Sequence, residues 1–144
     1  MWIAKTMAEA AEYLDFEKAC FVCSNDSYDE IYLGDITEIF EYNKSREVKT
    51  YTITNDSFNY PKISEEDIKG DTAEINAQII LDVLENKNRN GAFNTIAANS
   101  ALALYCSGYS ENLNECQKAA EDSILSGAAF AKLNELKKFS NKLD

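Results

Sequence analysis

The sequence predicts an α/β protein in which a mixed sheet, with one or more parallel strands plus an antiparallel hairpin, packs against several helices. Three observations support this class. A short apolar run at residues 19–23 follows a helical pattern, a β-rich stretch covers residues 31–54, and helical patterns occupy most of the chain from Ser64 onwards. A chain of 144 residues can hold one core, so we expect residues 1–144 to form a single region.

The amino-terminal elements are expected to alternate between helix and strand. Residues 2–16 carry apolar side chains at helical spacing, which predicts a helix. The uninterrupted apolar run 19–23 has the length of a strand and suits the middle of a parallel sheet. Residues 31–54 are rich in β-branched and aromatic side chains, which predicts two or three strands, and residues 43–46 have the composition of a hairpin turn.

The second half of the chain is expected to be helical. A capping-box sequence at Ser64 begins a short helix. Asp71 or Thr72 can cap the next helix, whose apolar stripe extends to residue 84. Residues 92–107 are apolar nearly all round, which indicates a buried helix. Asn112 predicts the cap of a further helix near the carboxyl end.

Composition excludes several classes of function. The formal charge of −11 disfavours binding to nucleic acid and to anionic membranes. The chain contains no His, so a His-based triad and a His-ligated zinc site are excluded. The uncharged stretch 90–110 carries several Asn and Ser side chains, so we interpret it as a buried helix rather than a membrane span. No secretory signal opens the sequence, and we expect reduced thiols and a cytoplasmic location.

The four cysteines are interpreted as small buried apolar side chains. Cys20 and Cys23 form a C-x-x-C sequence, but they fall in the expected strand, where residues three apart point to opposite faces. A redox motif needs a helix N-terminus, and zinc needs two more convergent ligands, which the spacing of Cys106 and Cys116 does not supply. We therefore expect neither chemistry.

The most densely charged segment, Asp26-Ser27-Tyr28-Asp29-Glu30, directly follows the apolar strand. Ligand sites in open α/β sheets gather at the carboxyl ends of strands, and carboxylates there can hold Mg²⁺. A solvated acidic turn is the alternative, and spacing alone favours it. The five glycines are scattered singly, so the sequence contains no glycine-rich phosphate loop.

Three stretches resemble the carboxyl-terminal part of anthranilate phosphoribosyltransferase. Residues 21–24 with the acidic segment 26–30 resemble the family's strand, turn and Asp-Glu motif. Residues 70–77 resemble its Gly-Gly-(Asp/Ser)-x-x-x-Asn-Ala helix entry. Residues 96–105, followed by Gly108 and residues 126–129, resemble its Leu-Asn-Ala-Ala helix and Ser-Gly-Lys-Ala ending. The order and spacing of these motifs over about 120 residues make the resemblance fairly specific. The family usually has His-Gly where Cys23 and Ser24 stand.

The resemblance implies a glycosyltransferase reaction of tryptophan biosynthesis. Anthranilate nitrogen would displace pyrophosphate from phosphoribosyl pyrophosphate (PRPP), and Mg²⁺ would neutralise the leaving group. Carried over residue by residue, Asp29 and Glu30 are the implied metal ligands, whereas Asn76 and Asn99 are expected to have structural roles. No catalytic residue is assigned to this chain, and its substrate-binding residues stay open.

The resemblance covers only part of the family enzyme. The family's glycine-rich pyrophosphate loop, its helical amino-terminal domain, its Lys-His-Gly-Asn segment and its anthranilate-binding Arg have no counterpart here. We therefore expect the chain to be inactive alone, and to self-associate through apolar surface contributed by the helix at residues 92–107. Two alternatives remain: a non-catalytic acidic α/β binding or assembly module, and part of a nucleoside phosphorylase of similar fold. The Asp-Glu pair after the apolar strand favours the transferase over the phosphorylase.

Overall fold

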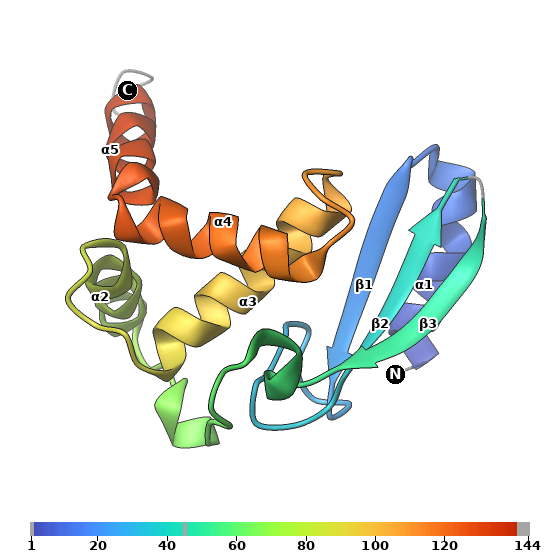
Figure 1. Cartoon of the computed structure of the whole chain (residues 1–144), viewed down its shortest axis with the longest axis horizontal. Coiled ribbons are helices and arrows are strands. Elements are labelled where there is room, and N and C mark those ends of the chain that lie inside the picture. Colours follow the sequence, from blue (N-terminus) through green and yellow to red (C-terminus); the bar gives the residue numbers. More distant parts are fainter. Residues whose placement is uncertain (1, 45, 141–144) are drawn as a thin grey trace.

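The computed structural model describes residues 2–44 and 46–140 and confirms the α/β class, with a sheet at one end and a group of helices at the other (Figure 1). The helices and strands are, in chain order, α1 (Trp2–Ala10), β1 (Lys18–Ser24), β2 (Thr37–Asn43), β3 (Arg46–Ile53), α2 (Ala73–Leu84), α3 (Gly91–Cys106), α4 (Leu113–Leu125) and α5 (Ala128–Ser140), with short 3-10 helices at Ala11–Leu14, Asn55–Phe58 and Glu65–Asp67.

The sheet is antiparallel throughout the described residues, with the order β1-β2-β3. Phe21 on β1 lies opposite Phe40 on β2, and Phe40 lies opposite Thr50 on β3. The expectation of a parallel strand was therefore wrong for this part of the chain. A parallel pair needs a crossover connection, usually a helix. Residues 25–36, which join β1 to β2, contain neither helix nor strand, so the chain turns straight back beside β1.

Two strands, rather than three, form within residues 31–54. Residues 31–36 lie in the loop before β2, where Ile31 and Leu33 are fully buried in the main core with Ile39 and Phe58. The predicted hairpin turn is consistent with the pairing of Asn43 with Arg46, while Ser45 lies outside the described residues. Residues 31–33 are thus apolar because they form a buried loop. Amino-acid composition alone does not distinguish such a loop from a buried strand.

Helices cover the sheet at β1 from two sides. α1 contacts β1 and β2, and its Ala8, with the adjacent Ala11, is completely buried. Small alanine side chains let the helix approach the sheet closely. On the other side, α3 contacts β1 and contributes Ala98 and Ala101 to the main core. β1 is therefore enclosed on both faces.

The helices begin at side-chain caps, of which Thr72 and Asn112 were predicted and Asn90 was not. The side chains of Thr72, Asn90 and Asn112 each accept a hydrogen bond from a backbone N–H in the first turn of α2, α3 and α4. α3 is buried along most of its length, as its apolar composition predicts. α5 extends away from the body and has no buried residue (Figure 1). None of the helices in the described ranges is long and apolar enough to cross a membrane.

Candidate functional site

A tight reversal of the backbone places the acidic segment at the end of β1. The N–H of Ser24 donates to the carbonyl of Tyr28 at 2.9 Å, and the N–H groups of Ser27 and Tyr28 donate back to the carbonyl of Ser24 at 3.0 Å. Asn25 and Asp26 adopt φ angles of 48° and 51° inside this turn. Asn and Asp tolerate this left-handed conformation better than most residues, because their short polar side chains can bond locally.

Ser24 also ties the segment after the turn to the sheet. Its hydroxyl donates to the carbonyl of Glu30 at 2.5 Å, accepts from the N–H of Tyr32 at 3.1 Å, and lies 2.7 Å from the hydroxyl of Thr37 on β2. Ser24 and Thr37 are both completely buried. The serine that stands where the family usually has glycine therefore supplies three contacts that fix the shape of the loop.

Asn99 on α3 holds the backbone immediately after Glu30. Its amide oxygen accepts from the N–H of Ile31 at 2.9 Å, and its amide nitrogen donates to the carbonyl of Ile31 at 3.1 Å and to that of Thr95 at 2.9 Å. Asn76 holds the backbone just before α2 in a similar way, because its amide oxygen accepts a hydrogen bond from the N–H of Asp71 at 2.9 Å. Both asparagines thus have the structural roles that the sequence predicts.

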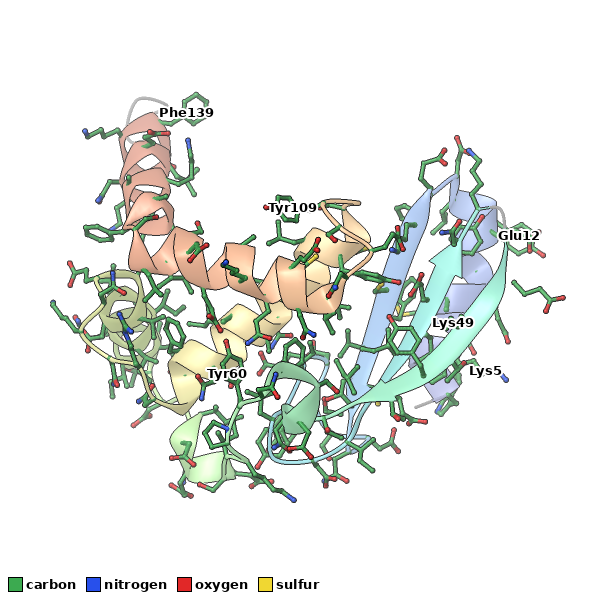
Figure 2. All side chains as sticks on the ribbon, in the orientation of Figure 1. Lys5, Glu12, Lys49, Tyr60, Tyr109 and Phe139 are labelled. Atoms are coloured by element: carbon green, nitrogen blue, oxygen red, sulfur yellow. The ribbon has the colours of Figure 1, made fainter. Side chains whose placement is uncertain are left out.

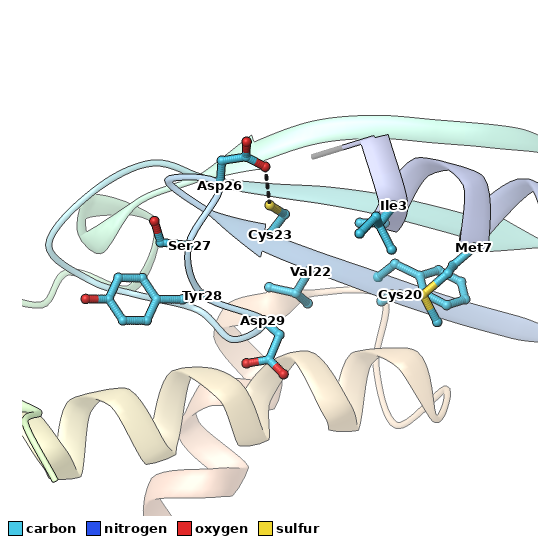
Figure 3. Close-up of a pocket in the computed structure, with 11 residues that line it drawn as sticks. Ile3, Met7, Cys20, Val22, Cys23, Asp26, Ser27, Tyr28 and Asp29 are labelled. Atoms are coloured by element: carbon cyan, nitrogen blue, oxygen red, sulfur yellow. Dashed lines mark hydrogen bonds between the residues drawn. The ribbon is translucent and has the colours of Figure 1, made fainter.

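Asp29 and Glu30 are both exposed at this loop, but they face different hollows. Asp29 lines a hollow between α1 and β1, which Figure 3 shows with Ile3 and Met7 on the helix side. Glu30 lines a hollow against α2 and α3, with Ile79 and Thr95. Partial burial, and then the negative charge of Asp29, raise the pKa of Glu30. The two carboxylates are therefore close enough to repel each other.

The pair fits the coordination chemistry of Mg²⁺. Carboxylate oxygens are the hard ligands that Mg²⁺ prefers, and this ion commonly combines one or two protein carboxylates with water and substrate phosphates. Among the described residues, no group of three or more Asp, Glu or Cys side chains gathers into a metal site. A cation at Asp29 and Glu30 would accordingly take its other ligands from water or from substrate.

Cys23 and Cys116 are buried as expected, whereas Cys20 and Cys106 are only partly buried. All four are free, and Cys20 and Cys23 point to opposite sides of β1. Cys20 packs against the main core, whereas the thiol of Cys23 donates to a carboxylate oxygen of Asp26 at 3.8 Å (Figure 3).

Sequence analysis missed a buried polar cluster that joins the sheet to α3. Glu41 on β2 is 7% exposed and accepts hydrogen bonds from the hydroxyls of Tyr51 and Tyr105 at 3.0 Å. The Lys18 ammonium lies 3.8 Å from this carboxylate and 3.4 Å from the ring centre of Tyr105. Glu41 stands between two buried aromatic residues, Phe40 and Tyr42, and this local pattern was the only sequence signal for its burial.

Residues 2–130 match the family described as "Glycosyl transferase family, a/b domain". The anthranilate phosphoribosyltransferase of Thermomicrobium roseum is 36% identical to this chain over 143 residues, which are 98% of this chain and 41% of that protein. The Bacillus subtilis anthranilate phosphoribosyltransferase is 31% identical over 134 residues, which are 93% of this chain and 39% of that protein. The chain thus spans about 40% of the length of these curated relatives.

Solved anthranilate phosphoribosyltransferases share the fold of this chain. The Saccharomyces cerevisiae enzyme in complex with PRPP and Mg superposes with a TM-score of 0.83 at 23% identity, and the match covers 92% of this chain and 38% of that one. The Thermus thermophilus enzyme gives a TM-score of 0.79 at 25% identity, covering 90% of this chain and 37% of that one. The likeness reaches across both the sheet and the helices.

Proposed function

Because this chain belongs to the glycosyl transferase family whose α/β domain it matches, we propose that it is a portion of an anthranilate phosphoribosyltransferase of tryptophan biosynthesis. In this proposal, residues 1–144 form the carboxyl-terminal part of the α/β domain. The reaction joins anthranilate to the phosphoribosyl group of PRPP, with both substrates bound mainly by the rest of the enzyme. The proposed task of this portion is to bind Mg²⁺ through Asp29 and Glu30.

The observation that carries the proposal is the placement of Asp29 and Glu30 at the end of β1, on a loop that Ser24 and Asn99 hold from both sides. An ion bound there would stabilise negative charge on the departing pyrophosphate. The two carboxylates would hold the ion, while the buried hydroxyl of Ser24 and the amide of Asn99 keep the backbone of residues 30–32 in one conformation. A relative solved with PRPP and Mg supports the choice of ion.

The same proposal includes three properties of the chain on its own. It is inactive, since neither substrate is positioned without the rest of the enzyme. It self-associates through exposed apolar side chains. It resides in the cytoplasm, consistent with four cysteines that the structure leaves unpaired.

Metal binding is tested with Mn²⁺ as a paramagnetic substitute for Mg²⁺ and nuclear magnetic resonance as the readout. Addition of Mn²⁺ to the 144-residue chain should broaden the amide signals of residues 28–32 before all others. Asp29→Asn with Glu30→Gln should abolish this selective broadening. The control Asp15→Asn with Glu17→Gln removes the same two charges at the other end of β1, where both contact Lys44, and should preserve it. Equal broadening in the two double variants would refute the assignment.

Function is tested by co-expressing the chain with the unmatched portion of the Thermomicrobium roseum enzyme and following the loss of anthranilate fluorescence with PRPP and Mg²⁺. We expect turnover from the pair, none from the chain alone, and a strong loss with Asp29→Asn and Glu30→Gln. Near-normal turnover by that double variant at limiting Mg²⁺ would show that these carboxylates do not bind the metal.

A further inference from the structure

We propose that Cys20 on β1 and Cys106 at the end of α3 are a site of reversible oxidation, where a low-molecular-weight disulfide such as oxidised glutathione converts the two thiols into one disulfide bond. The bond joins the sheet covalently to α3. These two elements hold the acidic loop from both sides, through Ser24 at the end of β1 and Asn99 on α3. Neither thiol has a part in the proposed metal site.

Reciprocal contacts fasten the end of α3 to the beginning of β1. The Lys18 ammonium donates to the carbonyl of Tyr105 at 3.3 Å, and the thiol of Cys106 donates to the carbonyl of Lys18 at 3.8 Å. Cys20 comes two residues after Lys18 on the same strand, so its side chain leaves β1 on the same face. The Cys106 thiol is therefore held beside the face from which Cys20 projects.

The two thiols are in direct contact in the folded chain. Burial raises the pKa of Cys20 to about 12, and Cys106 adds to this rise through its charge and through a hydrogen bond between the two thiols. Cysteines that lie far apart can be joined only after the backbone moves. Because Cys20 and Cys106 already touch, a bond between them needs no rearrangement of the fold.

The other two cysteines are not alternative partners. Cys23 points to the opposite face of β1, where its thiol contacts Asp26. Cys116 is completely buried on α4, and its thiol donates to the carbonyl of Ser110 at 3.5 Å. No third Cys, Asp or Glu joins the pair as a metal ligand within the described ranges. The arrangement is thus that of a dithiol and not of a metal centre.

The carboxyl end of α3 gives an oxidant access to the pair. The expectation that the helix at residues 92–107 supplies exposed apolar surface was wrong, because α3 is covered by its neighbours over most of its length. Its end differs: Cys106 is only partly buried, Ser107 is exposed, and Figure 2 shows the exposed Tyr109 in the loop that follows. Since Cys20 is also only partly buried, a small disulfide can reach this site.

The reaction is a thiol–disulfide exchange in two steps. The Cys106 sulfur attacks oxidised glutathione, forms a mixed disulfide and releases one glutathione. The Cys20 sulfur then attacks the Cys106 sulfur, closes the protein disulfide and releases the second glutathione. The protons of the two protein thiols pass to the two released thiolates, and the two electrons of the protein thiols reduce the glutathione disulfide.

The order of attack follows from the surroundings of Cys20. The raised pKa keeps this thiol protonated, and only a thiolate attacks, so the first step belongs to Cys106. In the second step the mixed disulfide lies next to Cys20, and this proximity compensates for the small thiolate fraction. Excess reduced glutathione reverses both steps, which suits the proposed cytoplasmic location, where disulfides are usually transient.

The test incubates the folded chain with oxidised glutathione at mildly alkaline pH and locates disulfides by mass spectrometry of unreduced proteolytic fragments. We expect a product lighter by two hydrogen atoms, with the fragments that carry Cys20 and Cys106 joined. Cys20→Ala and Cys106→Ala should each prevent this product, whereas the matched control Cys23→Ala with Cys116→Ala should preserve it. Circular dichroism checks that each variant folds, and the mapping on the parent chain needs no variant.

The bond should also stabilise the fold. It closes the loop of residues 21–105 in the unfolded chain, so the urea midpoint of unfolding should rise by about 1–2 M. Hydrogen exchange of the Ile31 amide, which donates to Asn99, should slow by about tenfold or more. Reduced glutathione should restore both values to those of the reduced chain.

Several outcomes would overturn the inference. These are glutathione that stays attached to Cys106 without a second bond, a bond that includes Cys23 or Cys116, and a bond that forms only in the urea-unfolded chain. A Cys20–Cys106 bond that leaves the urea midpoint unchanged, or that resists reduction by glutathione, would equally contradict it.

Discussion

Asn99 is the residue whose replacement should disturb the acidic loop most directly. Its side chain satisfies both backbone groups of Ile31, which is completely buried one residue after Glu30. Asn99→Ala removes both hydrogen bonds and leaves the N–H and C=O of Ile31 without a side-chain partner. The bond from Asn99 to the carbonyl of Thr95 is also lost, but that carbonyl lies one helical turn earlier in α3 and keeps its helical partner.

The expected loss of stability follows from the buried N–H and C=O groups of Ile31. Each buried backbone group that loses its partner costs roughly 1–3 kcal/mol, so the free energy of unfolding should fall by about 2–6 kcal/mol. A chain of this size has a total stability of about 5–15 kcal/mol, so the loss is a large fraction of it. With a urea dependence of about 2 kcal/mol per M, the midpoint of unfolding should shift by about 1–3 M.

Urea unfolding followed by far-ultraviolet circular dichroism measures this shift. Asn76→Ala is the matched control, since it removes the same side chain from a helix whose hydrogen bonds to Asp71 are exposed to water. Water can replace those bonds, and the expected cost is less than about 1 kcal/mol. If the two variants lost similar stability, the hydrogen bonds from Asn99 to Ile31 would not stabilise the fold by the stated amount.

The remaining predictions concern the buried cluster around Glu41. Glu41→Ala should lower the free energy of unfolding by about 3–5 kcal/mol. It removes the acceptor of the Tyr51 and Tyr105 hydroxyls, and it leaves the Lys18 ammonium, with a side chain only 11% exposed, paired only with the exposed carboxylate of Glu111. Tyr51→Phe should cost about 1 kcal/mol, and equal losses in urea titrations would contradict this. Burial, followed by the nearby Cys106 thiol and Glu41 carboxylate, raises the pKa of Cys20 from 9.0 to about 12. The protonated thiol is favoured in the folded state, so its contribution to stability is complete below pH 9 and is lost between pH 9 and 12. Thermal melts of Cys20→Ala should therefore lose less stability over this interval than the parent chain, and identical pH profiles would argue against a buried thiol.

Local signals in the sequence predicted many elements of this fold. Thr72 and Asn112 were identified as caps because a side-chain oxygen next to the first turn satisfies a backbone N–H without help from distant residues. The apolar run 19–23 was recognised as a strand, and the position of Asp29 and Glu30 directly after it followed from chain order. The roles of Asn76 and Asn99 as structural residues were also predicted, although Ile31, the partner of Asn99, was not.

Sequence patterns thus account for most of the helices and strands, for the caps at Thr72 and Asn112, and for the position of two carboxylates after β1. Only the tertiary structure decided that β1 pairs antiparallel with β2, that Glu41 is buried beneath Tyr51 and Tyr105, and that Asp29 and Glu30 face different hollows. The physical reason is the range of the interactions. A cap or an apolar period depends on residues within a turn of each other, whereas strand direction and the burial of a charge depend on partners tens of residues away, such as Tyr105 for Glu41.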